Sequence, residues 1–499
     1  MTTTPDRPSR RFRKRWIVWI LLAGWAGVAV WNSVKPMPPG TNMSTPAVAL
    51  ASQDVRFLSD LTYADPQGQL VYEQQIFDAV LRIVDESESF VVADFFLFND
   101  LMGAAEGVHR PLSRQLADKL IARKAAKPSL SILVITDPIN DVYGGARSAL
   151  LEEMRRAGIE VVVTDLQAMR DSNAAYSSLW RVFAQWWGNS PQPGSMPNPF
   201  DTGPSRVTLR SWLALLNFKA NHRKLVVADR SDGTLAGLVA SANPHDASSA
   251  HSNVALQITG APALQMIESE LAIARFSGWT RHIYAASPEA AAGVDPNDAV
   301  NVSFITEQAI RAHLVKSLDA TRNGDSVRIA TFYLADRKVI DALLNAANRG
   351  VDVRLILDPN KDAFGRQKDG VPNRPVANEL VTKSGGKIQV RWYRTHGEQF
   401  HTKLALITHA NRLTASLGSA NLTRRNIGNY NLEANLALEA NLSSALAQQM
   451  LGYFNRLWNN EGATAAGTEF TAPFGAYADT DKVRYWRYRF MESTGLGTF

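Results

Sequence analysis

An internal duplication constrains this chain more than any other feature. The stretch "SILVITDPINDVYGG" at 131–145 matches "VRLILDPNKDAFGR" at 353–366. The stretch "SANPHDASSAHSNVALQI" at 241–258 matches "SANLTRRNIGNYNLEANLAL" at 419–438. A chain of 499 residues is too long for one ordinary core, so two large units are expected. Two copies in one chain suggest two similar units related by a pseudo-twofold axis.

Within each copy, apolar β-branched runs alternate with helical patterns. In "RKVIDALLNAANRGVDVRLILD" (337–358) an apolar stripe at helical spacing ends at Gly350, and an alternating strand follows. Strand, helix, strand implies an α/β fold with a largely parallel, covered sheet. We therefore predict two α-β-α sandwich repeats with mostly parallel mixed sheets, packed about the pseudo-twofold axis.

Each copy also carries a histidine and a lysine two positions apart at the start of an apolar run, in "NHRKLVVAD" and "FHTKLALITH". Residues two apart on a strand share a face, and a twofold arrangement can bring both pairs to one site. A single pair would be explained by a strand end with a solvated lysine. Two pairs, each followed by Ser-Ala-Asn, argue against coincidence. The residues are His222, Lys224, Ser241 and Asn243 in the first copy and His401, Lys403, Ser419 and Asn421 in the second.

This set of side chains suits displacement at a phosphodiester. Lysine ammoniums and asparagine amides supply donors for the non-bridging oxygens. One neutral imidazole can attack phosphorus and form a phosphohistidine, while the other donates a proton to the leaving alkoxide and later activates the acceptor. No metal or other cofactor is required, and the sequence offers no compact His/Asp/Glu cluster at a recognised metal-binding spacing.

The constellation resembles the phospholipase D superfamily, with its duplicated H-x-K-x4-D signature followed by G-S-x-N. The first copy has Asp229 at the aspartate position and Ala240 before its Ser-Ala-Asn, whereas the second has Thr408 and an intact "GSAN". Glu433 matches the acid that orients a catalytic histidine in the family, and we aligned Ala255 with it in the first copy.

The resemblance implies catalytic residues and supporting residues, but the sequence does not fix the order of the two histidines. By the family's usual assignment, His222 is the nucleophile and His401 the general acid/base. We expect Glu433 beside His401, where a carboxylate would hold the imidazole protonated. The residues expected to bind or support the phosphate are Ser241, Asn243, Ser419, Asn421, Asp229 and Glu433.

The N-terminus predicts a membrane anchor. Seven basic residues and one acid lie within residues 1–35, so this segment holds the whole excess of the +6 net charge. An apolar run with tryptophans at both ends follows at 16–34, and basic residues before it place the body outside the cytoplasm, in the bacterial periplasm. The alternative is a signal peptide cleaved after "AVALA" at 47–51. The absence of cysteine excludes disulfides, thiolate metal sites and a cysteine nucleophile.

Three features favour phospholipid as the substrate: the anchor, a body without basic excess, and an aromatic insert at 167–220 that could enter the bilayer interface. A lid helix packed on the core explains the insert equally well. The resemblance points to the branch that makes cardiolipin or phosphatidylserine, because "NHRK" looks like the first motif of cardiolipin synthases.

Two other functions stay open. An exported nuclease is the first, because the tail "DKVRYWRYRF" alternates basic and aromatic residues that could stack bases; an edge strand or a membrane-facing patch is the favoured interpretation of its period of two. A catalytically degenerate lipid-binding scaffold is the second. The predicted organisation is a basic cytoplasmic segment (1–15), an anchor (16–34), a tether (35–55), a first repeat (56–285), a linker (286–300), a second repeat (301–465) and a basic/aromatic tail (466–499).

Overall fold

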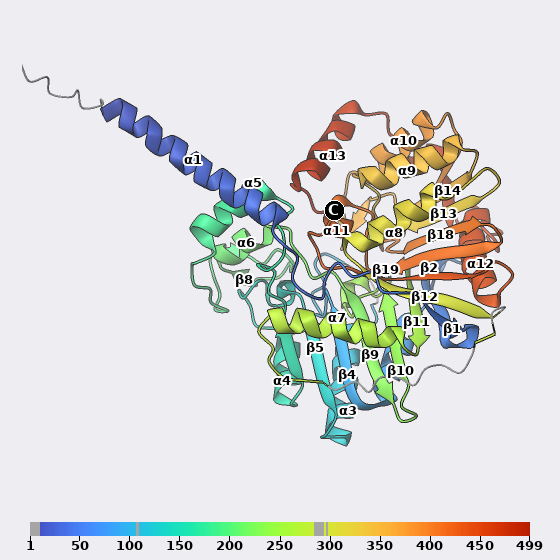
Figure 1. Ribbon diagram of the computed structural model, residues 1–499, viewed down its shortest axis with the longest axis horizontal. Helices are drawn as coiled ribbons and strands as arrows, with labels where there is room; N and C mark the ends of the chain where they lie inside the picture. Colours follow the sequence, from blue (N-terminus) through green and yellow to red (C-terminus); the bar gives the residue numbers. More distant parts are fainter. Residues whose placement is uncertain (1–9, 106–108, 284–293, 296–297) are drawn as a thin grey trace, which may run out of the picture.

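Each copy of the duplicated segment forms one sheet in the computed structural model, which describes residues 10–105, 109–283, 294–295 and 298–499 (Figure 1). The strand orders are β3-β2-β11-β10-β9-β4-β5-β6 and β1-β12-β20-β19-β18-β13-β14-β17-β21. From β2 to β6, the first order is repeated strand for strand from β12 to β17 in the second. The predicted α/β class is therefore confirmed.

The elements follow the same order in the two repeats. The first sheet contains β2 (Val55–Ala64), β3 (Leu70–Glu73), β4 (Ser87–Phe95), β5 (Ser131–Thr136), β6 (Glu160–Val163), β9 (Lys224–Arg230), β10 (Leu235–Ala240) and β11 (Asn253–Thr259). The second contains β1 (Val48–Ala51), β12 (Ala299–Thr306), β13 (Ser326–Thr331), β14 (Asp352–Leu357), β17 (Ile388–Tyr393), β18 (Lys403–His409), β19 (Arg412–Gly418), β20 (Ala434–Asn441) and β21 (Thr471–Pro473). The helices of the first repeat are α2 (Ile76–Asp85), α3 (Leu112–Ala126), α4 (Ala149–Arg156) and α7 (Pro262–Phe276), and those of the second are α8 (Gln308–Asp319), α9 (Arg337–Asn348), α10 (Asn373–Lys383), α11 (Arg424–Ile427) and α12 (Ala445–Asn459).

The sheets are mixed, but the prediction that they are mostly parallel is wrong. Among the described strands of the two large sheets, parallel pairing is confined to β4-β5-β6 and β13-β14-β17. The strands that follow the His-x-Lys motifs instead turn back through tight hairpins, β9 into β10 and β18 into β19. These turns use residues with positive φ, Gly233 in the first and Ala410 and Asn411 in the second. A short hairpin can join only antiparallel neighbours.

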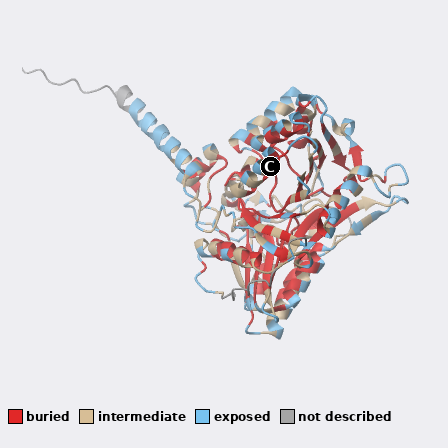
Figure 2. Cartoon of the chain, turned by 45° about the vertical axis from the view of Figure 1, so that its right-hand side comes forward, coloured by how far each residue is buried: buried red, intermediate tan, exposed pale blue. Residues whose placement is uncertain are grey.

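The two sheets face one another across a shared core. On β9, Leu225 and Val227 point into this core, whereas Val226 points to the helices on the outer face. On β18, Leu404 lies in the shared core and Ala405 under the outer helices. Strands buried on both faces explain the continuous apolar runs in the sequence, and Figure 2 shows buried strands, in red, through the middle of the molecule.

Helix α1 (Arg10–Val34) projects from the body and is exposed along most of its described side chains (Figures 1 and 2). Among the described residues, it is the one helix long and apolar enough to cross a membrane, judged by length and composition. Its C-terminal end packs on the insert, where Asp171 N donates to Asn32 O at 2.8 Å and Lys35 Nζ to Gln167 O at 2.6 Å.

The segment that follows α1 is not the simple tether predicted for 35–55. Residues Val48–Ala51 pair antiparallel with β12 and so belong to the sheet of the second repeat. Upstream, Thr45 N donates to Phe304 O at 3.1 Å and Met43 N to Thr306 Oγ1 at 2.7 Å. This pairing could not be predicted because the segment is rich in proline, yet β12 has a free edge that needs a partner. The predicted linker at 286–300 lies mostly outside the described residues.

The C-terminal tail also differs from the prediction. It forms the short edge strand β21 and then α13 (Lys482–Thr494), not an edge strand through the basic and aromatic residues. Asp481 caps the helix by accepting from Val483 N at 2.8 Å, and Tyr488 is buried under it. The aromatic insert contains α5 (Ala174–Leu179), a π-helical turn η3 (Trp180–Ala184), the hairpin β7 (Met196–Pro197) with β8 (Arg206–Val207), and α6 (Leu209–Leu215).

Candidate active site

The two His-x-Lys motifs meet in one cavity of about 590 Å³ between the repeats. His222 and His401 both line it and both are buried. Each histidine stands two residues before the start of its strand, so that the lysine at the start of the strand turns back toward it. Lys224 Nζ donates to His222 O at 2.6 Å, and Lys403 Nζ donates to His401 O at 2.9 Å.

An aromatic ring completes this arrangement in each repeat. The Phe96 ring lies 4.9 Å from the His222 ring and 5.2 Å from Lys224 Nζ. The Phe332 ring lies 5.0 Å from the His401 ring and 5.5 Å from Lys403 Nζ. Cation–π contacts of this kind hold a desolvated ammonium without neutralising it. The two halves of the site are therefore built alike.

Backbone pairing between the repeats connects each histidine to the other copy. Asn221 pairs with Leu432, and His222 N donates to Leu432 O at 2.9 Å. In the same way, Ser252 pairs with Phe400, the residue before His401. Glu433 follows Leu432, and Asn253 follows Ser252. Each of these two side chains therefore lies beside the histidine of the other repeat.

This crossing corrects the prediction that Glu433 lies beside His401. The structure pairs Glu433 Oε1 with His222 Nδ1 at 2.7 Å. His401 Nδ1 instead lies 3.2 Å from Asn253 Oδ1. Because Asn253 Nδ2 already donates to His251 O at 2.9 Å, its oxygen is the atom left to accept from His401. One histidine is thus supported by a carboxylate and the other by an amide.

Asn253 is also the true counterpart of Glu433, which corrects our alignment of Ala255 with that glutamate. Ser419 Oγ donates to Glu433 and accepts from Ala434 N at 2.9 Å. Ser241 Oγ donates to Asn253 Oδ1 at 2.8 Å and accepts from Val254 N at 3.0 Å. The second copy therefore has two more residues between its serine and its acid, and this shift hid the match. Both serines serve to hold the histidine-supporting side chains.

Two further aspartates, which are not among the predicted site residues, support the histidines. Asp137 accepts from Asn221 N at 2.7 Å, and Asp358 accepts from Phe400 N at 2.8 Å. Each holds the residue before a histidine. Burial raises the pKa of Asp137 to about 8 and that of Asp358 to about 7. The sequence held a signal for both residues, since each is the aspartate of the Asp-Pro dipeptide that occurs in both copies.

The other predicted residues divide between the site and the scaffold. Asn243 and Asn421 line the cavity. Asp229 lies at the far end of β9 from His222, where it accepts from Ser89 N at 2.8 Å and Phe90 N at 3.0 Å. The prediction that Asp229 supports the phosphate is therefore wrong, because its carboxylate holds the start of β4. Thr408 has the corresponding task in the second repeat, where its hydroxyl accepts from Ser326 N at 3.1 Å.

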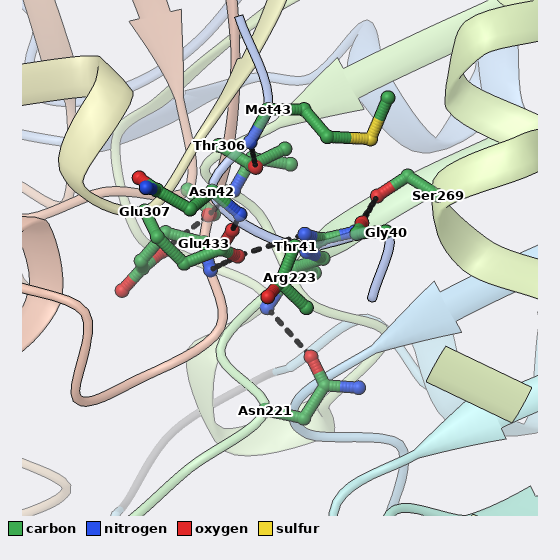
Figure 3. A network of polar contacts seen from close by, with 12 residues as sticks. Gly40, Thr41, Asn42, Met43, Asn221, Arg223, Ser269, Thr306, Glu307 and Glu433 are labelled. Atoms are coloured by element: carbon green, nitrogen blue, oxygen red, sulfur yellow. Dashed lines mark hydrogen bonds and ion pairs between the residues drawn. The ribbon is translucent and has the colours of Figure 1, made fainter. Parts of the chain in front are cut away.

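A buried ionic network lies directly behind the first motif (Figure 3). Arg223, between the motif histidine and lysine, donates to Glu270 and to Glu307 at 2.7 Å each. Glu307 Oε1 also accepts from Glu433 N at 3.0 Å, and its Oε2 accepts from Asn42 N at 2.5 Å. Glu307 adopts φ of 47° and ψ of −120°, a conformation that a non-glycine residue holds only where its surroundings enforce it. The segment after α1 is thus part of the support of Glu433.

Burial dominates the electrostatics of the site. It lowers the pKa of His222 to about 4 and that of Lys224 to about 7, and it places the pKa values of His401 and Lys403 well below their ordinary values. Burial acts to raise the pKa of Glu433, but its interactions with His222, Lys224 and Ser419 together outweigh burial and the pKa is lowered. At neutral pH, Glu433 is ionised and both imidazoles are neutral in the empty site.

Comparisons with known proteins agree with this geometry. Residues 314–458 match the family described as "Cardiolipin synthase, PLD-like domain". Cardiolipin synthase A of Pseudomonas syringae pv. syringae is 22% identical over 403 residues, which cover 77% of this chain and 68% of that protein. The family match and this relative support the phospholipase D superfamily. The fold is also similar to that of a phosphatidylserine synthase from Haemophilus influenzae Rd KW20, with a TM-score of 0.55, 10% identity, and coverage of 90% of this chain and 97% of that one.

Proposed function

We propose that this superfamily member is a membrane-anchored, cardiolipin synthase-like phosphatidyltransferase that acts on phospholipid through a phosphohistidine. The observation that carries the proposal is the pair of buried, neutral histidines with Nδ1 engaged, lining one cavity. Water in place of an alcohol would make the same site a phospholipase. The similarity to cardiolipin synthase A supports a lipid substrate.

In the first step, His222 Nε2 attacks the phosphorus of the donor lipid. The N–P bond forms, the P–O bond to the headgroup breaks, and the headgroup oxygen takes a proton from His401. Glu433 supports the nucleophilic role because an ionised carboxylate fixes His222 with the proton on Nδ1 and the lone pair on Nε2. Lys224, Lys403 and the motif asparagines stabilise the charge on the non-bridging oxygens.

In the second step, the hydroxyl of an acceptor gives its proton to His401 and attacks phosphorus. The N–P bond breaks and His222 returns to its starting state. His401 must hold a proton in the first step although burial lowers its pKa. The negative charge of the bound phosphodiester offsets the two lysine ammoniums, so we expect substrate binding to raise the pKa of His401.

The surroundings of the cavity support lipid over nucleic acid. Its walls include the insert residues Phe200, Trp212 and Phe218 and the C-terminal Phe499. On the outer side of the insert, Phe183 and Trp186 are 65% and 76% exposed. The insert therefore combines the two predicted roles. Trp212 lines the cavity as a lid would, whereas Phe183 and Trp186 are exposed as a contact with the bilayer would require.

Helix α13 extends this apolar surface. Val483, Trp486 and Phe490, at positions i, i+3 and i+7, are all exposed. Close contacts link the two regions: Asp171 holds the end of α1, and Gly495 at the end of α13 packs against Ser172 O. We propose that α1 crosses the inner membrane once with the body in the periplasm, and that the insert and α13 rest on the bilayer surface.

The test incubates the full chain with mixed phospholipid vesicles and, separately, with oligonucleotides. We expect a new phospholipid or phosphatidic acid, formed equally well in the presence of a strong chelator because the mechanism uses no metal. Cleavage of the oligonucleotide without a lipid product would reject the proposal in favour of an exported nuclease. The absence of any reaction in a folded protein would favour the scaffold.

A double Trp186→Ala, Trp187→Ala variant tests the contact with the bilayer. Each exposed aromatic that enters the interface removes apolar area from water, worth roughly 25 cal/mol per Å². The variant should bind vesicles more weakly and process a short-chain soluble ester as before. Tyr72→Ala is the matched control, since Tyr72 is exposed on β3, at the sheet edge opposite β6, from which the insert departs. Equal vesicle binding by both variants would contradict the membrane contact.

A further inference from the structure

Arg425, four residues after the motif asparagine Asn421, is a buried cation on the wall of the active-site cavity. Its Nε donates to Ser172 Oγ at 3.2 Å, its Nη2 donates to Gly495 O at 2.6 Å, and its guanidinium lies 5.3 Å from the centre of the Phe218 ring. All three partners are uncharged. Within the described part of the chain, Arg425 forms no ion pair with a carboxylate, and its Nη1 has no hydrogen bond.

The surrounding charges do not balance this arginine. Asp171, next to Ser172, is shared between Arg181 and Lys219. The carboxyl of Glu492 also faces this region, but burial raises its pKa to about 7, so it is ionised only in part at neutral pH. Lys219 lines the same cavity, but burial lowers its pKa to about 7, so it too is charged only in part at neutral pH. This part of the cavity, on the side of His222, therefore carries an excess of positive charge.

We propose that Arg425 binds the phosphate of the alcohol that accepts the phosphatidyl group, in a second anion subsite of the cavity. A buried charge without a counter-charge is costly, and a planar guanidinium with free N–H groups matches phosphate oxygens. The donor phosphate is held by the motif lysines, so a second anion in the cavity belongs to the other substrate. This inference rests on the proposed transferase function and assigns to Arg425 a part in selecting the acceptor.

The location of the subsite fits an acceptor that arrives from the membrane. Ser172 follows the residue that holds the end of α1, and Gly495 closes α13. A lipid with its phosphate at Arg425 would have its acyl chains toward the bilayer and its free hydroxyl toward the phosphohistidine. That hydroxyl gives its proton to His401 while its oxygen replaces His222 on phosphorus. The first repeat has Ala247 four residues after its motif asparagine, where the second has Arg425, so the subsite exists once.

The experiment compares acceptors that differ only by a phosphate, with the full chain and one donor lipid. The soluble pair is glycerol phosphate and glycerol, and the membrane pair is phosphatidylglycerol and diacylglycerol in the same vesicles. Arg425→Gln should lower kcat/KM for the phosphorylated member, relative to its partner, by roughly 10- to 100-fold, because a charge-assisted hydrogen bond is lost. A lower kcat/KM ratio in both pairs indicates a subsite for phosphate in general. A lower ratio in the membrane pair alone indicates a subsite for the phosphate of a lipid.

Arg424→Gln is the matched control, since Arg424 is the neighbouring residue, bonds to Tyr430 Oη at 2.8 Å and does not line the cavity. It should leave the acceptor ratio unchanged. If Arg425→Gln does not fold, Arg425→Lys keeps the charge but loses the planar fork, and the ratio should fall by about 3- to 10-fold. An unchanged ratio in the folded Arg425 variant, or an equal loss in Arg424→Gln, overturns the proposal.

Failure of the proposed function gives a different result. A wild type that hydrolyses the donor but transfers to none of the four alcohols rejects the transferase. The subsite is then tested by glycerol phosphate as an inhibitor of hydrolysis. Inhibition that is not competitive with the donor, and that Arg425→Gln removes, would keep the subsite; purely competitive inhibition would reject it.

Discussion

The two repeats place a histidine and a lysine at the start of corresponding strands, β9 and β18, but they support the histidine differently. His222 meets an ionised carboxylate, Glu433, whereas His401 meets the neutral amide of Asn253. A carboxylate and an amide fill similar volumes and both accept a hydrogen bond from Nδ1–H, so the fold tolerates either. They differ in how strongly they stabilise positive charge on the ring. A pseudo-symmetric scaffold can thus assign unlike roles to like residues by changing one supporting side chain.

The largest effect should come from exchanging the histidines themselves. His222→Asn and His401→Asn should each reduce turnover about 10³-fold or more, since one removes the proposed nucleophile and the other the proposed proton donor. The test uses a donor labelled at phosphorus and a rapid quench at neutral or alkaline pH. The label should remain on the protein only where His222 is present. Label retained by His222→Asn and lost from His401→Asn would reverse the two roles.

The next largest effects should come from the side chains that support the two histidines. Glu433→Gln removes the charge that orients His222 and should reduce kcat on the order of 10²-fold. Asn253→Ala removes only a neutral acceptor and should cost about 10-fold or less. Thermal unfolding of both variants serves as the control for folding. Equal losses would show that the charge of Glu433 has no special part in catalysis.

The pH dependence of kcat/KM should reveal the lowered pKa values in the free enzyme. His222 is neutral above about pH 4, so the acidic limb should lie near 4, below the ordinary histidine value of about 6.5. The basic limb should begin below pH 6.5, because His401 must hold a proton in the first step and burial lowers its pKa. The fall in kcat/KM should steepen as the pH rises through about 7, where Lys224 also loses its charge. An acidic limb near 6.5 in the wild type would contradict the burial of an uncharged His222.

Making the two halves alike should have a smaller effect. Asn253→Asp places a carboxylate beside His401 and should raise its pKa, so that the protonated form survives to higher pH. We expect rates within about threefold of the wild type near neutrality, with the basic limb of kcat moved upward. A profile that does not move would mean that His401 does not titrate in the measured range.

The smallest effect concerns the aspartate of the first motif. Asp229→Asn should lower the free energy of unfolding by about 1–3 kcal/mol, because the carboxylate accepts backbone N–H groups at the start of β4. It should leave kcat within about twofold. Thr408→Ala is the corresponding change in the second repeat. A loss of kcat without a loss of stability would return Asp229 to the catalytic site.

The sequence was sufficient for features that repeat along the chain. The duplicated motifs and the alternation of strand and helix predicted two similar α/β units with the His-x-Lys pairs in one site. The partner of each histidine could not be predicted in this way. Glu433 is close to His401 in sequence but reaches His222 because Asn221 pairs with Leu432 across the repeats. Such a crossing follows from docking two finished sheets and leaves no local pattern.

Other differences arose where local patterns compete with packing. The tail alternates basic and aromatic residues with a period of two, yet it forms α13 because Asp481 caps it and Tyr488 is buried against the second repeat. The segment after α1 has the composition of a linker and still pairs with β12. In both cases a free surface of the finished fold decided the outcome, which propensity alone does not encode.

The backbone between α1 and β1 limits where the body can be separated from helix α1. Asn42 N holds Glu307, which in turn holds the backbone of Glu433 behind His222. Cleavage before Pro38 would leave this stretch in place. Cleavage before Val48 would withdraw it and leave Glu307 without one of the two backbone donors that the described residues supply. A difference of ten residues in the point of cleavage would therefore decide whether the support of Glu433 survives.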